Sequence, residues 1–382
     1  MVELALAEQA PAAPALGGAA AGAAALEAAG FEPVAVTARR YVTPVPSARA
    51  DDDFLPIAAA AEAVEEAIVN VLLAGEDMRT EDGRLVPALK GERLLAALRE
   101  TGKLAFAGGC ALNVKLNQKI IARDEVKELF VQPASGDAGT AVGAAAYVSV
   151  ARGVPVEKME HVYLGPSYSN EDVIAACARH PNKPVWKKID DTPARIARIM
   201  VDGNPVAWFQ GRMEFGPRAL CNRSIVYHPG DASANDWLNQ RMERTEFMPF
   251  APVTAVEHAE ACYVGWREDQ VAADYMTMTY DCHADFRERC PAVVHVDGTA
   301  RPQIIRPQAD PFMHALLHAW HARSGQPALI NTSFNRHEEP IVCAPQDALG
   351  ALEDGMVDLV VLGESLLVWR KGENAFARAR FE

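Results

Sequence analysis

The order of apolar and polar residues predicts alternating helices and strands in the first half of the chain. Residues 55–74 carry apolar side chains at helical spacing and predict an amphipathic helix, and a second helix is expected over 90–101. The apolar run 103–107 predicts a short buried strand that leads into the glycine pair Gly108 and Gly109. Two adjacent glycines allow a ligand to approach the backbone closely.

A second strand is expected over 128–133, followed by an acid-and-glycine turn and the small-residue helix 141–152. Strand, turn and helix in this order are typical of an α/β layer with parallel strands. In such folds, ligands bind in loops at the carboxyl ends of the strands. Asp137 lies in the turn, where the simplest role of its carboxylate is to cap the following helix.

The proline-containing segment 156–190 predicts a connection with one helix over 170–180. After it, helical and strand patterns alternate again, with more strand than before. Helices are expected at 192–203, 231–244, 311–325 and 344–355. Strands are expected at 205–211, 251–258, 274–283, 292–298, 301–306, 327–335 and 358–370.

A chain of 382 residues is longer than one hydrophobic core usually serves, so the sequence predicts more than one domain. Repeated prolines and small residues mark the start of the chain as irregular. The predicted parts are an alanine-rich segment 1–53, a first domain 54–155, the connection 156–190 and a second domain 191–382.

The net charge of −14 and a pI near 5.2 argue against a broad surface for nucleic acid or anionic membranes. Any anion site must therefore be local. Glu3 and Glu8 do not fit a secretory leader, and no stretch is apolar enough to predict a membrane span. The seven cysteines are scattered without C-x-x-C pairs, which predicts reduced thiols and a cytoplasmic protein.

Local positive charge gathers in residues 211–229, which hold Arg212, Arg218 and Arg223 beside Glu214. A guanidinium group carries a fixed charge and a planar set of donors that suits carboxylate or phosphate, so several in one turn can converge on a polyanion. Ion pairs on a solvated face are the competing interpretation, and such pairs contribute little to stability.

A second polar motif favours the anion site. Hydroxyl and amide groups are concentrated at the end of an apolar strand, where such groups can contact a nucleotide or phosphate. These residues are Asn331, Thr332, Ser333 and Asn335. Capping of the following turn is the structural alternative. Arg244 and Arg301, from other segments, add cations that could line the same cleft.

The stretches GRMEFGPRALCNRSI, WLNQRMERTEFMPFAPV, PAVVHVDGTARPQ and PALINTSFNRHEEPIV occur in this order. They closely resemble the carboxyl-terminal domain of the O-carbamoyltransferases that include the NodU-, CmcH- and TobZ-like enzymes. Upstream, LAFAGGCALNVKLNQKI and LFVQPASGDAGTAVGAAAY are similar to the later half of that family's amino-terminal domain. The resemblance implies an α/β protein with a partial sugar-kinase/actin ATPase-like (ASKHA) domain followed by a YrdC-like mixed α/β domain.

The resemblance also implies a reaction. In the family, carbamoyl phosphate and ATP, with Mg²⁺, form a carbamoyl-adenylate, and the carbamoyl group then passes to a hydroxyl of a small molecule. By this analogy, the residues that hold the phosphates and the carbamoyl group are Arg212, Arg218, Arg223, Arg244, His295 and Arg301. Those that contact the nucleotide are Gly108, Gly109, Asn113, Asn222, Ser224, Asn331, Thr332, Ser333 and Asn335, and Asp137 binds a divalent metal ion.

Two departures from the family pattern stand out. Family members carry further amino-terminal residues with paired metal-binding histidines, whereas the first histidine here is His161, so the expected imidazole ligands of the metal at Asp137 are absent. We therefore expect association with a second copy or with a partner protein. Cys221 replaces a glycine of the family pattern, and its side chain would disfavour a positive φ or crowd a phosphate.

Two other functions stay open beside the active carbamoyltransferase. The chain could be a catalytically incomplete nucleotide-binding subunit, or an adenylate-forming half that needs a partner. It could also be a threonylcarbamoyl-adenylate synthase in tRNA modification, although no basic stripe predicts direct nucleic-acid contact. His314, His318 and His321 fall on one helix without a carboxylate on the same stripe, which favours an ordinary half-exposed helix surface.

Overall fold

The chain divides into two compact units, Met1–Leu94 and Leu95–Glu382. In the first unit, the structure describes one short antiparallel hairpin, in which β1 (Met78–Arg79) pairs with β2 (Leu85–Val86). The predicted segment 1–53 and the predicted helix 55–74 lie outside the described residues. The computed structural model describes residues 78–79, 85–86, 98–157, 159–244 and 249–371.

The second unit begins with a small parallel sheet. β3 (Lys103–Phe106) pairs in parallel with β4 (Glu128–Val131), which confirms the expected parallel neighbours. The 3-10 helix η1 (Gly109–Leu112) and helix α4 (Val114–Ile121) connect the two strands, and helix α5 (Asp137–Ala151) follows β4. The expectation of a buried first strand is wrong, because the side chains of β3 alternate between exposed and half-buried.

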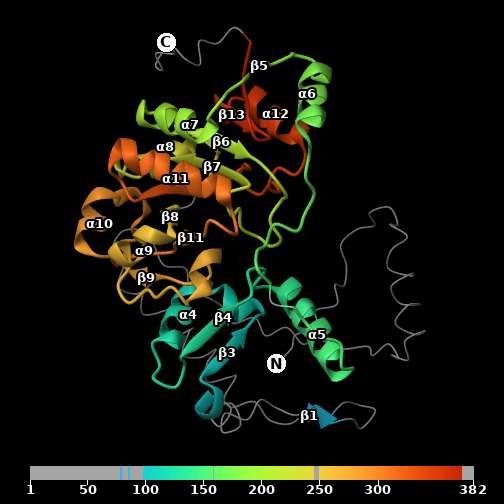
Figure 1. Ribbon diagram of the computed structural model, residues 1–382, viewed down its shortest axis with the longest axis vertical. Coiled ribbons are helices and arrows are strands. Elements are labelled where there is room, and N and C mark those ends of the chain that lie inside the picture. Colours follow the sequence, from blue (N-terminus) through green and yellow to red (C-terminus); the bar gives the residue numbers. More distant parts are fainter. Residues whose placement is uncertain (1–77, 80–84, 87–97, 158, 245–248, 372–382) are drawn as a thin grey trace, which may run out of the picture. The chain divides into compact units, whose positions relative to one another are not determined.

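The rest of the unit is built on a mixed eight-stranded sheet (Figure 1). Its spatial order is β11-β8-β12-β7-β6-β13-β14-β5, and only the pairs β11–β8 and β13–β6 are parallel. The strands are β5 (Val185–Lys188), β6 (Val206–Phe209), β7 (Arg223–Tyr227), β8 (Ala251–Ala255), β11 (Gln303–Ile305), β12 (Ala328–Ser333), β13 (Val360–Leu362) and β14 (Leu366–Trp369). A separate antiparallel pair joins β9 (Tyr280–Asp281) to β10 (Thr299–Ala300).

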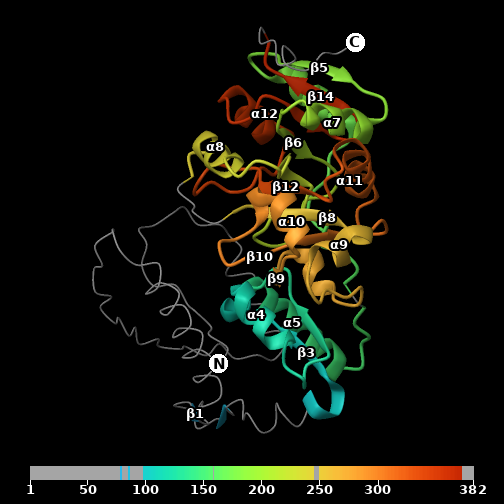
Figure 2. The same cartoon turned by 90° about the vertical axis from the view of Figure 1, so that its left-hand side faces the viewer.

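Helices cover both faces of the large sheet, with α7 and α11 on one side and α8 and α12 on the other (Figure 2). Side-chain caps begin several of them: Asp310 precedes α11 and accepts a hydrogen bond from the backbone of Met313. The helices are α6 (Asn170–Arg179), α7 (Thr192–Val201), α8 (Ala234–Arg241), α9 (Val256–Cys262), α10 (Ala284–Arg289), α11 (Pro311–Ser324) and α12 (Pro345–Glu353).

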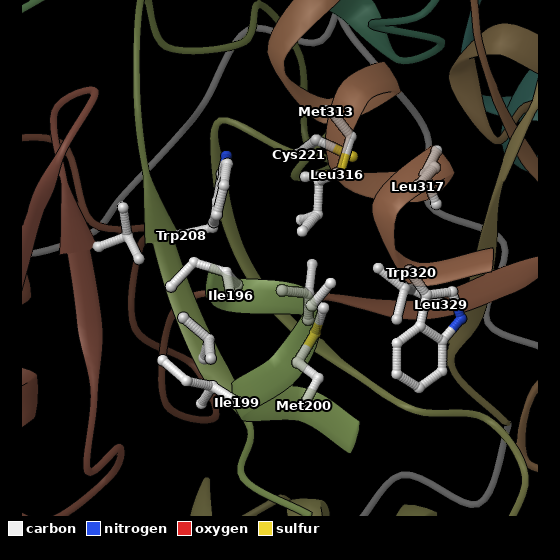
Figure 3. Close-up of a cluster of buried hydrophobic side chains, with 14 of the residues drawn as sticks. Ile196, Ile199, Met200, Trp208, Cys221, Met313, Leu316, Leu317, Trp320 and Leu329 are labelled. Atoms are coloured by element: carbon white, nitrogen blue, oxygen red, sulfur yellow. The ribbon is translucent and has the colours of Figure 1, made fainter. Parts of the chain in front are cut away.

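The main core lies between the sheet and the pair α7 and α11 (Figure 3). Ile196 and Met200 of α7 face Leu316 of α11, and Trp208 and Leu329 add side chains from β6 and β12. Strand residues two apart point to the same face of a sheet, so only alternate residues of each strand join this cluster. The core therefore fixes the positions of α7 and α11 against the sheet.

Several expected strands are not strands in the structure. Residues 256–258 begin helix α9, and 274–283 contains a strand only at β9, after the 3-10 helix η2 (Val271–Tyr275). Residues 292–298 form part of the 3-10 helix η3 (Pro291–Val293) and a turn. Residues 275–280 and the pair Ala292 and Val293 are buried, and burial outside a strand produces the same sequence pattern as a buried strand.

Three further strands differ from expectation. The run 358–370 forms two antiparallel strands, because Gly363 reverses the chain with φ 62° between β13 and β14. β7 lies inside the arginine-rich stretch, which the sequence suggested was a turn, and β5 lies inside the predicted connection. Both are single strands bordered by polar loops, so no alternating pattern long enough to identify them is present.

All seven cysteines lie within the described residues and are free thiols. No described helix combines the length and the apolar character that crossing a membrane requires.

We expect Ile196→Ala to lower the free energy of unfolding by about 2–5 kcal/mol, because Ile196 is fully buried between α7 and α11 and its truncation leaves a cavity. Urea unfolding followed by circular dichroism measures the change. Val201→Ala, on the same helix but 48% exposed, is the matched control and should cost less than about 1 kcal/mol. Equal costs for the two variants would contradict the described core.

Candidate functional site

Most of the predicted site residues meet at one edge of the eight-stranded sheet. Phe209 at the end of β6 pairs with Arg223 at the start of β7, and Ser224 pairs with Ser333 at the end of β12. β8 and β11 also begin at this edge. Segments that are far apart in the sequence are therefore brought together by strand register. Four strand spacings separate β6 from β11, which is about 19 Å.

The loop between β6 and β7 is organised by Glu214. Its Oε1 atom accepts hydrogen bonds from the backbone nitrogens of Leu220, Asn222 and Arg223 at 2.7, 2.7 and 3.1 Å. Burial raises the pKa of the Glu214 carboxyl, and these hydrogen bonds and the charge of Arg223 oppose that rise. One carboxylate oxygen thus fixes the turn that carries the arginines.

Arg223 is fully buried and is engaged by the loop itself. Its Nη1 donates to the carbonyls of Gln210 and Asn222, and its guanidinium lies 3.7 Å from the centre of the Phe209 ring. These contacts hold the guanidinium against carbonyls of the tight loop, while Nε of Arg223 has no hydrogen-bond partner among the described residues. They favour a structural role for Arg223 within the site.

Arg218 lies in the same loop as Arg223 but differs from it in its hydrogen bonding. Its Nη1 atom is buried and has no hydrogen-bond partner among the described residues. Burial, and to a lesser degree the charge of Arg301, lower the pKa of Arg218 to about 9. Two guanidinium groups close enough to oppose each other's charge, one with a buried unsatisfied donor, are the arrangement that an anion would complete.

A turn at residues 295–299 continues this positive region. The Nδ1 atom of His295 lies 3.2 Å from Oγ1 of Thr299, and Lys115 from α4 forms an ion pair of 2.6 Å with Asp297. Burial lowers the pKa of His295; Asp297 raises it, and Arg301 and Lys115 lower it further. The lowered pKa favours the neutral imidazole of His295, next to fixed cations.

Arg244 binds the polar motif that follows β12. Its Nη1 donates to Oγ1 of Thr332 at 2.8 Å, and its Nη2 donates to Ser333 and Asn335, including Oδ1 of Asn335 at 2.6 Å. The structure thus joins the predicted cation to three of the predicted nucleotide contacts. The guanidinium of Arg244 therefore fixes the conformation of this segment through its hydrogen bonds.

Arg212 and Asn222 line a pocket of about 540 Å³, at the carboxyl ends of the parallel strands β6 and β13. Arg212 donates to the carbonyls of Leu164 and Gly165 at 2.6 and 3.0 Å, and Asn222 donates to the carbonyl of Arg212. A volume of this size suits a nucleotide or a small ligand. Other lining residues are Tyr163, Tyr168, Gln210, Asp310 and Glu364.

Cys221 has φ 86°, the left-handed region that the glycine of the family pattern would adopt without strain. Its backbone nitrogen donates to Oγ of Ser224, and its thiol lies 3.2 Å from Oε1 of Gln303. Asn331 donates to the same Gln303 oxygen at 2.7 Å. Ser224 and Asn331 therefore belong to a buried polar network that supports the strained turn.

The predicted site residues of the first domain lie at the starts of helices. Gly108 has φ 99°, and a Cβ built on Gly109 would meet open space. Asn113 caps α4 by accepting from the backbone nitrogens of the next turn. Gly136 occupies the N-cap position of α5, and Asp137 is the first residue of this helix. Its assignment to a metal stays a prediction.

The sequence did not single out three polar residues of this edge. They are Lys115, Asp297 and Thr299. Asp297 and Thr299 lie inside the motif HVDGTAR and Lys115 lies inside GGCALNVKL, so the motifs did carry a signal. The ion pair between Lys115 and Asp297 joins positions that are 182 residues apart, so the sequence alone does not reveal it.

Comparison with known families identifies the family of this chain. The chain matches a model described as the carbamoyltransferase C-terminus over residues 197–369 and one described as the carbamoyltransferase N-terminus over residues 47–146. The chain belongs to the carbamoyltransferase family. The matched region 197–369 contains the arginine loop, the 295–301 segment and the polar turn after β12.

Similar proteins agree with this family. The nodulation protein NolNO of Sinorhizobium fredii is 35% identical over 272 residues, which is 69% of this chain and 39% of that protein. The 3'-hydroxymethylcephem-O-carbamoyltransferase of Amycolatopsis lactamdurans is 31% identical over 300 residues, 76% of this chain and 55% of that protein. This carbamoyltransferase-family chain spans about half the length of the curated relatives it matches.

A solved structure, full-length HypF in its phosphate- and nucleotide-bound form, covers 47% of this chain and 22% of HypF. Its TM-score is 0.34 and its sequence identity is 18%, a likeness too distant to bear on function. The observed fold is mixed α/β, as the sequence predicted.

The strain at Cys221 can be isolated by comparing two variants that both lack the thiol. Cys221→Gly should be more stable than Cys221→Ala by about 1 kcal/mol, because only alanine keeps the Cβ that opposes φ 86°. Paired chemical denaturation curves measure this difference. An alanine variant as stable as the glycine variant, or more so, would show that the turn has no such strain.

The Lys115–Asp297 contact should make stability fall in acid. Partial burial raises the pKa of Asp297, but hydrogen bonds from Lys115 and Thr299 outweigh it and lower the pKa to about 2, below its ordinary value of 3.8. Since the folded pKa is the lower one, this stabilisation is complete above pH 3.8 and is lost as the pH falls toward 2. Unfolding measured from pH 5 to 2 should show a shallower loss for Asp297→Asn than for the wild type; identical slopes would contradict the contact.

Proposed function

We propose that this chain forms a carbamoyl-adenylate from carbamoyl phosphate and ATP and passes the carbamoyl group to a hydroxyl of a small molecule. The observation that carries the proposal is the buried, unsatisfied Nη1 of Arg218 beside Arg301, in a chain of the carbamoyltransferase family. An unpaired buried cation is costly, and a bound anion would remove that cost.

The charges of the edge suit two anionic reactants. Carbamoyl phosphate and ATP repel each other, so fixed cations must offset their charge before one can react with the other. Arg218 and Arg301 would bind phosphate oxygens, while His295, whose lowered pKa favours the neutral imidazole, would donate or accept one hydrogen bond at the carbamoyl group. These groups are held by strands and by Glu214, and therefore need little rearrangement.

The nucleotide would lie along the remainder of the edge. Arg244 orders the turn of Ser333 and Asn335, whose hydroxyl and amide groups suit contacts with ribose or phosphate. The pocket beside Arg212 offers the volume for the base or for the acceptor. Arg244 and Arg223 would therefore act as positioning residues, since Nη1 and Nη2 of both already bond to the protein.

The proposed reaction has two steps. A carbamate oxygen becomes bonded to the α-phosphorus of ATP, phosphate leaves from carbamoyl phosphate and pyrophosphate leaves from ATP, and water supplies the oxygen that the phosphate takes with it. The acceptor hydroxyl then bonds to the carbamoyl carbon and loses its proton, and AMP leaves. Pyrophosphate release therefore reports the first step without knowledge of the acceptor.

The described edge fits Mg²⁺ only as the ion that accompanies ATP. It offers guanidinium, hydroxyl and amide groups; of its carboxylates, Asp297 is paired with Lys115, and Oε1 of Glu214 accepts three backbone hydrogen bonds. Mg²⁺ commonly binds through phosphate oxygens and water with few protein ligands. When bound, the ion would neutralise phosphate charge, and Arg218 and Arg301 would complement it.

Arg218→Ala should reduce pyrophosphate release from ATP and carbamoyl phosphate about ten- to a hundredfold, because one charge-assisted contact in a desolvated site is worth about 1.5–3 kcal/mol. Arg218→Lys should fall between wild type and alanine, since lysine keeps the charge but loses the planar pair of donors. Calorimetric titration with carbamoyl phosphate should show a matching loss of affinity.

Arg179→Ala is the matched control, because Arg179 is an exposed arginine whose Nε bonds within its own helix α6. It should leave activity and binding unchanged. Unaltered activity in Arg218→Ala would remove Arg218 from the site. Binding of ATP without pyrophosphate release by the wild-type chain would contradict the proposed reaction and favour the nucleotide-binding subunit.

A further inference from the structure

A cluster of imidazoles lies between α9 and α11, outside the edge described above. His314 and His318 are one helical turn apart on α11, so their rings share one face of the helix. Glu257 reaches them from α9 and lies 2.9 Å from Nε2 of His314 through its Oε1 atom. The carboxylate missing from the histidine stripe in the sequence is therefore supplied by a different helix.

The distances within this cluster match the edges of a metal coordination shell. The Nε2 atoms of His314 and His318 are 3.3 Å apart. The Oε2 atom of Glu257 lies 3.1 Å from the first and 3.5 Å from the second. Zn–N bonds of about 2.0–2.1 Å place the ligand atoms of a tetrahedral ion ~3.3–3.4 Å apart. Three potential ligand atoms thus already form one triangular face of such a tetrahedron.

We propose that Glu257, His314 and His318 bind a divalent transition-metal ion of the zinc class, with water in the remaining position. Two imidazoles and one carboxylate are a ligand set that such ions prefer, whereas Mg²⁺ and Ca²⁺ favour oxygen ligands alone. The side chains of Glu257 and His318 are 45% and 46% exposed, so an ion can enter from solvent and keep a water ligand. The proposal is independent of carbamoyl transfer.

The surroundings add to the concentration of imidazole. His258 follows Glu257, and its ring centre lies 4.2 Å from that of His321 and 6.2 Å from that of His318. The Nε2 atom of His258 is buried without a hydrogen-bond partner among the described residues. His321 bonds through Nδ1 to the carbonyl of Gln326, which fixes the orientation of its ring. Four of the chain's ten histidines thus gather at one place, which a random surface would not favour.

A bound ion would connect two helices that are distant in the sequence. Glu257 and His314 are separated by 57 positions, and α9 and α11 both contact β8. An ion that binds the folded chain and not the unfolded one stabilises it in proportion to its concentration over its dissociation constant. The expected consequence is a metal-dependent rise in thermal stability.

The test uses the full chain after treatment with a chelator and dialysis. Calorimetric titration with ZnCl₂ should show one equivalent bound, and the melting temperature should rise with Zn²⁺ but not with Mg²⁺. His314→Ala, His318→Ala and Glu257→Gln should each weaken Zn²⁺ binding by at least about tenfold. Glutamine keeps a hydrogen-bonding oxygen, so its loss of affinity separates metal ligation from a hydrogen-bonded contact. Co²⁺ in place of Zn²⁺ should give the visible absorption of a tetrahedral site.

His337→Ala, at an exposed histidine outside the cluster, is the control and should bind Zn²⁺ as the wild type does. Absence of saturable Zn²⁺ binding by the wild type would overturn the proposal and leave the cluster as a hydrogen-bonded helix contact. Wild-type affinity in the His314→Ala and His318→Ala variants would also overturn it, because the ion would then bind elsewhere. Pyrophosphate release by these variants should stay at the wild-type level, which separates this site from the proposed reaction.

Discussion

The Oε1 atom of Glu214 accepts three backbone hydrogen bonds from one turn, and the arrangement of the sheet edge depends on this contact. Without it, the amide groups of Leu220, Asn222 and Arg223 would be buried without partners, which is costly for each group. The same turn carries Arg218 and the strained Cys221. A buried carboxylate therefore serves here as a scaffold that presents cations, and its negative charge partly balances them.

The structure divides the arginines of one short stretch into different tasks. Arg223 donates to carbonyls inside the loop, and Arg212 joins the loop to residues 164–165. Nη1 of Arg218 and Nε of Arg223 are both buried without a hydrogen-bond partner among the described residues. The chain as a whole is acidic, with a net charge of −14. The arginines of this loop thus add local positive charge to an acidic chain, whose net charge does not favour long-range attraction of polyanions such as nucleic acid.

The sequence predicted which polar residues lie near one another better than it predicted the role of each residue. It placed Arg218, Arg244, Arg301 and the turn after β12 at one anion site, because strand ends and motif order survive as sequence patterns. It could not separate Arg223 as a structural residue, since its carbonyl partners leave no trace in residue type. Glu257 was missed as a neighbour of the histidines, because the approach of α9 to α11 is set by packing on β8. Strands at 274–283 and 292–298 were wrongly expected, because buried irregular segments are as apolar as buried strands.

The loop between β6 and β7 is tied at both ends by strand pairing and in its middle by Glu214. Its conformational entropy is therefore lost when the domain folds, before any ligand arrives. An anion that bound at this loop would meet donors that are already oriented, so its binding free energy would not be reduced by the need to organise a flexible segment. Preorganisation of this kind favours slow dissociation over adaptability, and a site built in this way would discriminate among phosphate-bearing molecules by the fixed spacing of its charges.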